Sequence, residues 1–253
     1  MKFSSVPLLF AVIVAFWLWA ARSSLRRGEL TAGHERSIHV WLGLLAAWAV
    51  MTTLLATSGA YRTASFYSLL PGLWVPLAPV ALSLVLLWLW PDFRSALWAL
   101  TASTNPRAFL WLHATRIAAI GGVIKGTQGL LPASFAFPIG IPDLIFGLIS
   151  LVMALAYHRL RPGRAVLIAW NLAGMGVLML APVFMQLGLP GRFYTFTAQP
   201  DATALFEFPM VLAPTLVVTL LFFTNGWHAF TLWRTSIRAG VQHRVPDPAG
   251  ELS

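Results

Sequence analysis

Long apolar runs separated by short polar stretches fill the chain from its first residues to about position 233. A helix needs about 20 residues to cross about 30 Å of hydrocarbon, and about seven of the runs approach that length. They are Phe3–Ala21, Ile38–Ala56, Leu73–Trp90, Ala108–Ile124, a run that begins between Phe135 and Pro142 and ends near Tyr157, Ala165–Leu187 and Pro209–Trp233. The pattern therefore predicts an all-α polytopic membrane protein, a bundle of about seven transmembrane helices in a lipid bilayer.

Composition supports this class. Of the 253 residues, 58% are hydrophobic and only 10% are charged, and the mean hydropathy is +0.75. A soluble domain has about 25% charged residues, so soluble enzymes, disordered tails and collagens are excluded. We expect residues 1–240 to form a single transmembrane domain and the polar segment 241–253, with its two prolines, to be a disordered cytoplasmic tail.

The basic residues predict the orientation. With seven spans, one side of the membrane collects Arg22, Arg26, Arg27, Arg36, Arg94, Arg107, Arg159, Arg161, Arg164, Arg234, Arg238 and Arg244, and the other side holds Lys2, Arg62, Lys125 and Arg192. By the positive-inside rule the N-terminus lies outside and the C-terminus in the cytoplasm. Arginines that follow the first run favour a retained anchor over a cleaved signal peptide. The net charge of +9 comes from scattered residues and does not indicate a nucleic-acid partner.

Several kinds of chemistry are excluded or unsupported. The chain has no cysteine, so disulfides, thiolate nucleophiles and iron–sulfur clusters are excluded. It has no Walker loop, HExxH or GxSxG motif, and too few carboxylates for a two-metal site. We therefore do not assign an enzymatic activity, and we predict no catalytic residue and no metal.

The strongest candidate for a site is Arg116, which lies near the middle of the predicted span Ala108–Ile124. An arginine at that depth costs about 2.5–3.5 kcal/mol, so it needs a partner or a function. His113 lies three residues earlier and shares its helix face. Arg116 either marks a ligand site or ties helices together.

Asp143 is the acidic residue that could lie at membrane depth, and two interpretations remain open. If the fifth helix begins at Pro142, the aspartate lies in the first helical turn, near the outer surface and about 12 Å above Arg116. If the segment FAFPIGIP instead dips into the membrane, Asp143 can pair with Arg116 or Lys125 beside an outward-facing polar pocket.

A second polar group lies in the cytoplasmic half of the predicted bundle. It comprises His39, His113, Asn171, Asn225 and His228, of which Asn225 and His228 share a helix face. Two opposed histidines can hold haem b, which makes His39, His113 and His228 candidate ligands. Isolated histidines more often hydrogen-bond to neighbouring groups, so no cofactor is predicted.

Three segments follow one another in a recognisable order: RIAAIGGVIKGTQGLLPASFAFPIGIPD from Arg116 to Asp143, WNLAGMGVL from Trp170, and FPMVLAPTLVV from Phe208, followed by His228. Through these segments, over a little more than half of its length, the chain resembles a family of uncharacterised bacterial integral membrane proteins. Within these segments only LPASFAFPIGIPD is distinctive. The resemblance implies a multi-pass protein of the bacterial inner membrane and points to Arg116, Asp143, Asn171 and His228. The chain departs from the pattern at His113, where the family has a glutamine-like position, and this counts against haem.

Three hypotheses follow from the sequence. The first is a bundle that binds a small anionic solute or a lipid head group in a polar cavity, for transport or sensing. The second is an accessory or assembly subunit of a larger membrane complex, in which Arg116 and Asp143 hold helices together and other membrane subunits are the partners. The third is an intramembrane enzyme or b-type haem protein that uses His39, His113 and His228.

Overall fold

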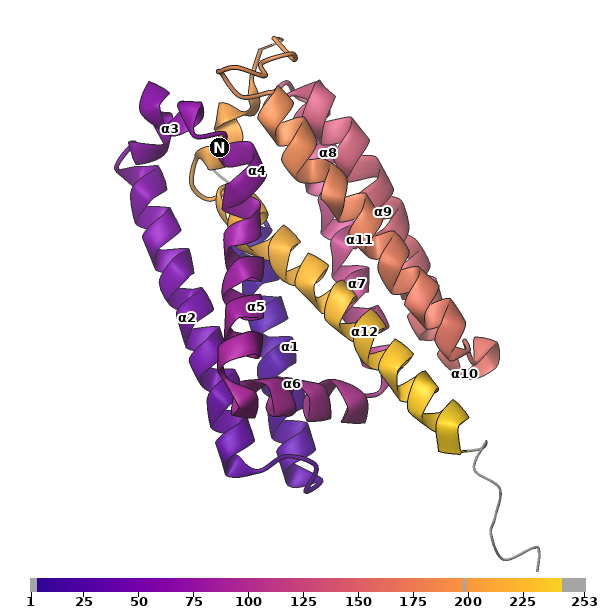
Figure 1. Cartoon of the computed structure of the whole chain (residues 1–253). Helices are drawn as coiled ribbons and strands as arrows, with labels where there is room; N and C mark the ends of the chain where they lie inside the picture. Colours follow the sequence, from indigo (N-terminus) through magenta and orange to yellow (C-terminus); the bar gives the residue numbers. More distant parts are fainter. Residues whose placement is uncertain (1–3, 198, 243–253) are drawn as a thin grey trace, which may run out of the picture.

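The computed structural model describes residues 4–197 and 199–242, and within them all regular structure is helical (Figure 1). The chain begins with two long helices, α1 (Val6–Arg26) and α2 (Ala32–Thr57), joined by a tight turn. The Thr31 side chain caps α2 by accepting a hydrogen bond from the His34 amide at 3.2 Å. We call the end of the bundle where α1 begins the upper end, and the end where α1 turns into α2 the lower end.

The next segment returns along the bundle and then turns across its lower end. The short elements η1 (Ala60–Arg62), α3 (Ala64–Ser68), α4 (Pro71–Trp74) and η2 (Val75–Leu77) lead into α5 (Ala78–Leu89), and then into α6 (Pro91–Ser103). Helix α6 lies crosswise near the lower end of the bundle, above the turn between α1 and α2 (Figure 1). It buries Phe93 and Leu97 and exposes Asp92 and Arg94, so it is an amphipathic helix suited to a membrane surface.

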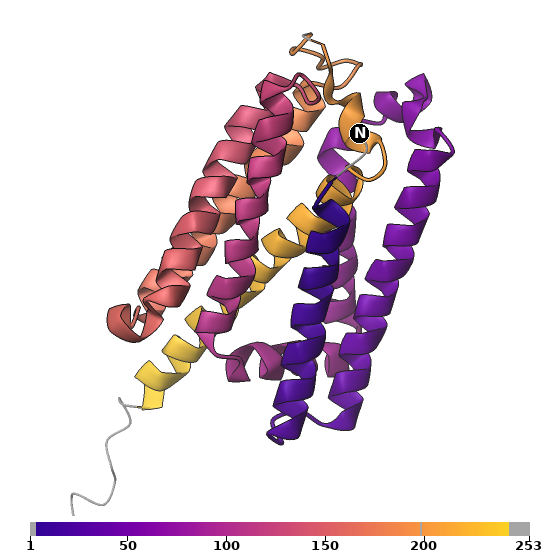
Figure 2. The ribbon, with the colours of Figure 1, turned by 180° about the vertical axis from the view of Figure 1, so that it is seen from behind.

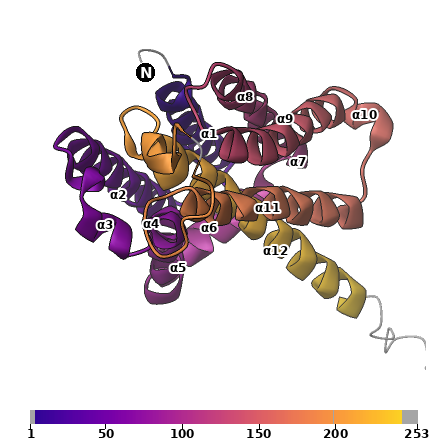
Figure 3. The same cartoon turned by 90° about the horizontal axis from the view of Figure 1, so that it is seen from above.

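The second half of the chain forms the other side of the bundle (Figure 2). It contains α7 (Pro106–Ala114), η3 (Thr115–Ala119), α8 (Ile120–Thr127), α9 (Ala133–Leu155), α10 (Tyr157–Leu160), α11 (Arg164–Leu187), η4 (Ala202–Phe206), the π-helical turn η5 (Ala213–Val217) and α12 (Val218–Gln242). Helix α12 packs along α11 and crosses the bundle obliquely, between the group of α1, α2 and α5 and the group of α7 to α11 (Figure 3).

Among the described residues, six helices are long and apolar enough to cross a membrane: Val6–Arg26, Ala32–Thr57, Pro71–Leu89, Ala133–Leu155, Arg164–Leu187 and Ala213–Ser236. The predicted fourth span, Ala108–Ile124, is not among them. Its residues form a helical run that η3 interrupts with a 3₁₀ segment between α7 and α8. The prediction of one continuous helix there was wrong, because Arg116 lies within η3 and the tighter turn packs its backbone against α9.

The fifth span also differs from the expectation. Helix α9 begins at Ala133, before the predicted range, and Pro138 and Pro142 lie inside it. Asp143 is therefore ten residues into the helix, about 15 Å along its axis. The interpretation that placed Asp143 in a first helical turn is wrong. The last span was predicted from Pro209, but it begins as the π-helical turn at Ala213.

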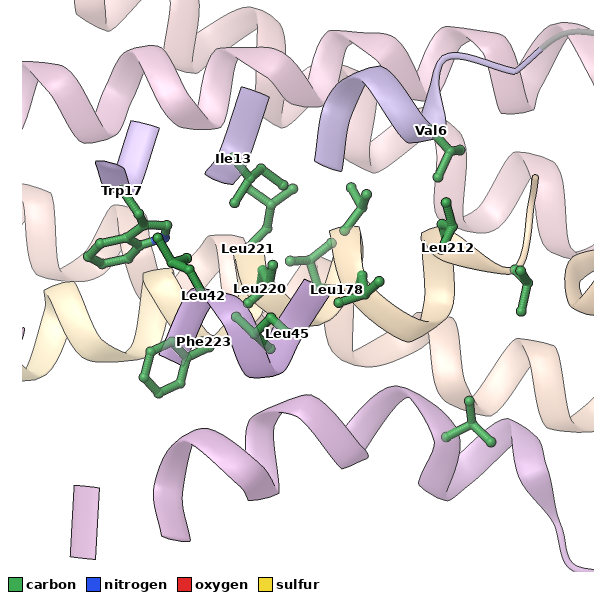
Figure 4. Packing of buried hydrophobic residues seen from close by; sticks show 14 of the residues in the cluster. Val6, Ile13, Trp17, Leu42, Leu45, Leu178, Leu212, Leu220, Leu221 and Phe223 are labelled. Carbon is green, nitrogen blue, oxygen red and sulfur yellow. The ribbon is translucent and has the colours of Figure 1, made fainter. Parts of the chain in front are cut away.

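The centre of the bundle is apolar and aromatic. Side chains from α1, α2 and α12, including Ile13, Leu45 and Leu220, interdigitate along its axis (Figure 4). The rings of Trp17 and Trp41 meet edge to face with centroids 5.4 Å apart. Outward-facing apolar side chains are exposed on most long helices, as Trp88 on α5 is at 77%, which suits contact with lipid.

The segment predicted to be a disordered tail, 241–253, is helical at Val241 and Gln242, which end α12. The rest of it lies outside the described residues.

Candidate functional site

The site begins with the break in the α7–α8 run. Arg116 lies in η3, and none of its side-chain surface is exposed. A glycine makes this placement possible: a Cβ at Gly147 of α9 would lie 2.5 Å from the Ile117 nitrogen and 2.8 Å from the Arg116 carbonyl carbon. The backbone of η3 therefore packs directly against α9, as small residues allow between membrane helices. This contact brings the guanidinium to the face of α9 that carries Asp143.

Arg116 and Asp143 form an ion pair in which the Arg116 Nε–H donates to Asp143 Oδ1. The two partners differ in their surroundings. The guanidinium is enclosed by protein, whereas 16% of the Asp143 side chain remains exposed. The structure thus brings together the two residues that the sequence could not place relative to each other, and only the carboxylate reaches solvent-accessible space.

The remaining faces of the guanidinium contact groups that sequence reasoning missed. Arg116 Nη1 donates to the Gly174 carbonyl at 3.3 Å, and the guanidinium carbon lies 4.0 Å from the centre of the Phe146 ring. Phe146 in turn stacks on Trp170 with ring centroids 4.2 Å apart. A cation–π contact of this kind stabilises a desolvated arginine by about 2 kcal/mol. The contact with Phe146 could have been expected from the sequence, since Asp143 and Phe146 are three residues apart and therefore share one helix face.

A cavity of about 370 Å³ opens above the pair, between α1, η3, α8, α9, α11 and η5. Small-molecule sites commonly measure about 300–1,000 Å³. Its wall is mostly apolar, with Phe135, Ile139, Val217 and Leu221 among the lining residues. Gly121 and Gly122 also line this cavity, and among the described residues no atom of another element lies closer than 4.0 Å to a Cβ added at either position.

A second cation lies higher in the cavity. Lys125 is nine residues after Arg116, about 14 Å further along the run. Its ammonium donates to the Met210 sulfur at 3.3 Å, which is its one hydrogen bond within the described ranges. Ser4 Oγ approaches the same sulfur at 3.5 Å. A thioether is a weak acceptor, so this ammonium and hydroxyl face a site that an anionic oxygen would suit better.

Of the second polar group predicted from the sequence, four residues are buried below the ion pair and the fifth, His39, lies on the surface. His113, Asn171, Asn225 and His228 are all buried, with exposed fractions between 0% and 2%. His39 is exposed on α2. The prediction that His39 belongs with the other histidines was wrong, because its position faces the surface of the bundle.

His39 therefore does not share the buried surroundings of His113 and His228. The His228 ring stacks on Phe109 with centroids 4.1 Å apart, and His113 meets the edge of Phe146. In the part of the chain that the structure describes, no three His, Asp or Glu side chains gather as metal ligands would.

Comparison with known proteins places these elements in one family. A family model described as a domain of unknown function (DUF8737) matches residues 72–234, which is well over half of the chain and includes Arg116, Lys125, Asp143 and His228. No curated protein and no solved structure matches the chain.

Proposed function

The chain belongs to the DUF8737 family, and from this premise we propose that it binds a small anionic solute or a lipid head group in the cavity above Arg116, for transport or sensing. The observation that carries the proposal is the Lys125 ammonium, which faces an apolar cavity and has a thioether as its acceptor. A buried or half-buried cation is stabilised by an anion within hydrogen-bond reach, because charge-assisted hydrogen bonds are about twice as strong as neutral ones.

The charges lining the cavity favour an anionic ligand. Arg116 and Asp143 compensate each other, so among the described lining residues the uncompensated charge is that of Lys125. The wall between Lys125 and Asp143 is apolar, which suits a hydrocarbon part of the ligand. The ligand is therefore an amphiphile whose carboxylate or phosphate binds Lys125 and the serine hydroxyls of the N-terminal segment.

The membrane setting of the proposal follows from the basic residues. The turn between α1 and α2, helix α6 and helix α10 all lie at the lower end (Figure 1), and most arginines fall in or beside these elements. We place the lower end in the cytoplasm and the cavity toward the outside, with seven crossings that include the interrupted α7–α8 run. The resemblance noted above supports the bacterial inner membrane.

A binding experiment tests the proposal. Purified protein is unfolded thermally with octyl phosphate, octanoate or octylammonium present, and the transition is followed by fluorescence of the 12 tryptophans. Ligands stabilise the native state in proportion to RT ln(1 + [L]/Kd), about 2.7 kcal/mol at 100 times Kd. We expect both anions to raise the transition temperature and the cation to leave it unchanged. A lipid as the natural ligand would appear as a phospholipid that co-purifies and is displaced by octyl phosphate.

Matched variants make the result specific. Lys125→Met removes the cavity ammonium and is expected to abolish the anion response. Arg192→Met removes an exposed arginine outside the cavity and should retain it. An equal response in both variants would mean that the anions act elsewhere.

The accessory-subunit hypothesis and the ligand-binding hypothesis differ in whether variants of the Arg116–Asp143 ion pair fold. If Arg116 and Asp143 only hold η3 against α9, the variants Arg116→Gln and Asp143→Asn lose folded protein. If the cavity is a ligand site whose binding charge is Lys125, the double variant still folds and keeps its response to octyl phosphate.

A further inference from the structure

Buried polar side chains continue from the ion pair toward the lower end of the bundle. His113 lies on α7, Asn171 on α11, and Asn225 and His228 on α12. Each is at least 98% buried. Polar groups at this depth in a membrane protein are costly and commonly mark ion or proton pathways.

These side chains are neighbours. The His113 ring lies one helical turn before Arg116, interacts electrostatically with Arg116 and His228, and lies beside the Asn171 side chain. Asn225 lies close to Arg116, because both side chains approach Gly174. A Cβ added to Gly174 would lie 2.8 Å from Asn225 Oδ1 and 3.1 Å from Arg116 Nη1. We call the continuous set Asp143, Arg116, His113, Asn171, Asn225 and His228 the polar file.

The polar file reaches a second cavity. His228 lines a space of about 320 Å³ near the lower end, together with Thr104, Tyr157, Arg164 and Thr235. Asp143 lines the upper cavity. The file thus begins in one cavity and ends in the other, and the two lie toward opposite ends of the bundle.

The members of the file also lack protein partners for many of their polar atoms. Within residues 4–197 and 199–242, no hydrogen bond reaches either ring nitrogen of His113, Arg116 Nη2, Oδ1 of Asn171 or Asn225, or His228 Nδ1. The asparagine amides are oriented, because each Nδ2 donates to a carbonyl four residues earlier, at 2.7 Å for Asn171 and 3.0 Å for Asn225. Their oxygens are therefore free acceptors.

An unsatisfied buried polar group costs about 1–3 kcal/mol, and several together would approach the total stability of about 5–15 kcal/mol of a folded protein. Buried water that makes two to four hydrogen bonds removes this cost. Unsatisfied donors and acceptors thus cluster along one path between the two cavities.

We propose that the polar file conducts protons between the upper and lower cavities, with His113 and His228 as relays. This activity goes beyond the binding of an anionic ligand and does not require it. A neutral imidazole accepts a proton on one ring nitrogen and releases the other nitrogen's proton to the next water, so each proton that enters at Asp143 leaves beyond His228.

The charges around the polar file favour Asp143 as the residue at which protons enter. A lone arginine repels protons in a membrane pore, but the pair with Asp143 compensates Arg116 on the upper side. Among the described residues, the other charged or titratable groups at the cavities are Lys125 at the upper one and Tyr157 and Arg164 at the lower one. Replacing Asp143 by a neutral side chain is therefore expected to block conduction.

Proton flux in liposomes tests the proposal. The full chain is reconstituted into liposomes that contain the pH dye pyranine, and a potassium gradient with valinomycin makes the interior negative. We expect the interior to acidify faster than in protein-free liposomes, and His113→Leu or His228→Leu to reduce the rate to that of protein-free liposomes. His39→Leu replaces an exposed histidine and should conduct like the wild type.

The outcomes are distinct from those of the ligand experiment. Wild-type protein that binds octyl phosphate but conducts no protons would overturn the proton pathway and leave the binding site standing. Conduction that persists in well-folded His113→Leu and His228→Leu proteins would overturn the assignment of these residues. If both variants fail to fold, Asn225→Leu replaces them as the test of the path. Wild-type flux no faster than that of protein-free liposomes would by itself overturn the proposal.

Discussion

The ion pair between Arg116 and Asp143 predicts an unequal response to removal of its two partners. In Asp143→Asn the guanidinium, with none of its side chain exposed, loses its counter-charge. Breaking a buried pair from one side costs about 3–5 kcal/mol. The asparagine oxygen can still accept a hydrogen bond and the Phe146 ring still faces the cation, so we expect a loss of about 2–4 kcal/mol.

Removal of the arginine should cost less. In Arg116→Gln the remaining carboxylate is 16% exposed, and it can bind water from the cavity or take up a proton. We expect a loss of about 1–2 kcal/mol, the cost of a partly satisfied buried polar group. The double variant should be more stable than the sum of the single losses predicts, with a coupling energy of about 2 kcal/mol.

Denaturant unfolding in mild detergent, followed by tryptophan fluorescence, measures these differences. Asp92→Asn on α6 is the control, because Asp92 is exposed and surface substitutions change stability by about 0.5 kcal/mol or less. Losses that are equal for the two partners, or additive within about 0.5 kcal/mol in the double variant, would refute the reasoning that the guanidinium is the more deeply buried charge.

Three further predictions follow from the packing, the cavity and the orientation. Gly147→Ala should destabilise the protein by about 1–3 kcal/mol, because its Cβ would meet the backbone of η3. Gly122→Ala, whose Cβ meets no atom of another element within 4 Å among the described residues, should cost nothing by the same unfolding assay. Lys125→Met should weaken octyl phosphate binding at least tenfold, about 1.4 kcal/mol, in a titration by calorimetry; unchanged affinity would contradict the assignment of the ammonium. Because the chain has no cysteine, Ser65→Cys and Ser95→Cys can each be labelled alone: an impermeant maleimide added to intact cells should modify the first and not the second, and the reverse pattern would invert the topology.

Much of the fold could be predicted from the sequence because membrane spans depend on length and composition. Six helices that are long and apolar enough to cross a membrane lie close to the runs seen in the sequence. The fourth run was different, because whether a helix stays continuous depends on what packs against it. Gly147 belongs to α9, and its contact with the backbone of η3 cannot be seen in the local pattern of residues 108–124.

The site was predictable only in part for a similar reason. Arg116 and Asp143 were recognisable as costly residues at membrane depth, but their distance depended on where α9 begins. Pro142 suggested a helix start, although two prolines are accommodated inside this membrane helix. The role of Met210 beside Lys125 had no local signal, since the two residues are 85 positions apart. His39 was misplaced because similar depth along the membrane does not place residues on the same face.

The most direct test of the central claim is a density map of the protein purified gently from its native membrane. The account predicts elongated non-protein density in the cavity, with its polar end at Lys125 and its apolar part extending toward Asp143. A cavity closed by side chains, with partner helices packed against α8 and α9 and no density beside Lys125, would contradict a ligand site and support a structural subunit.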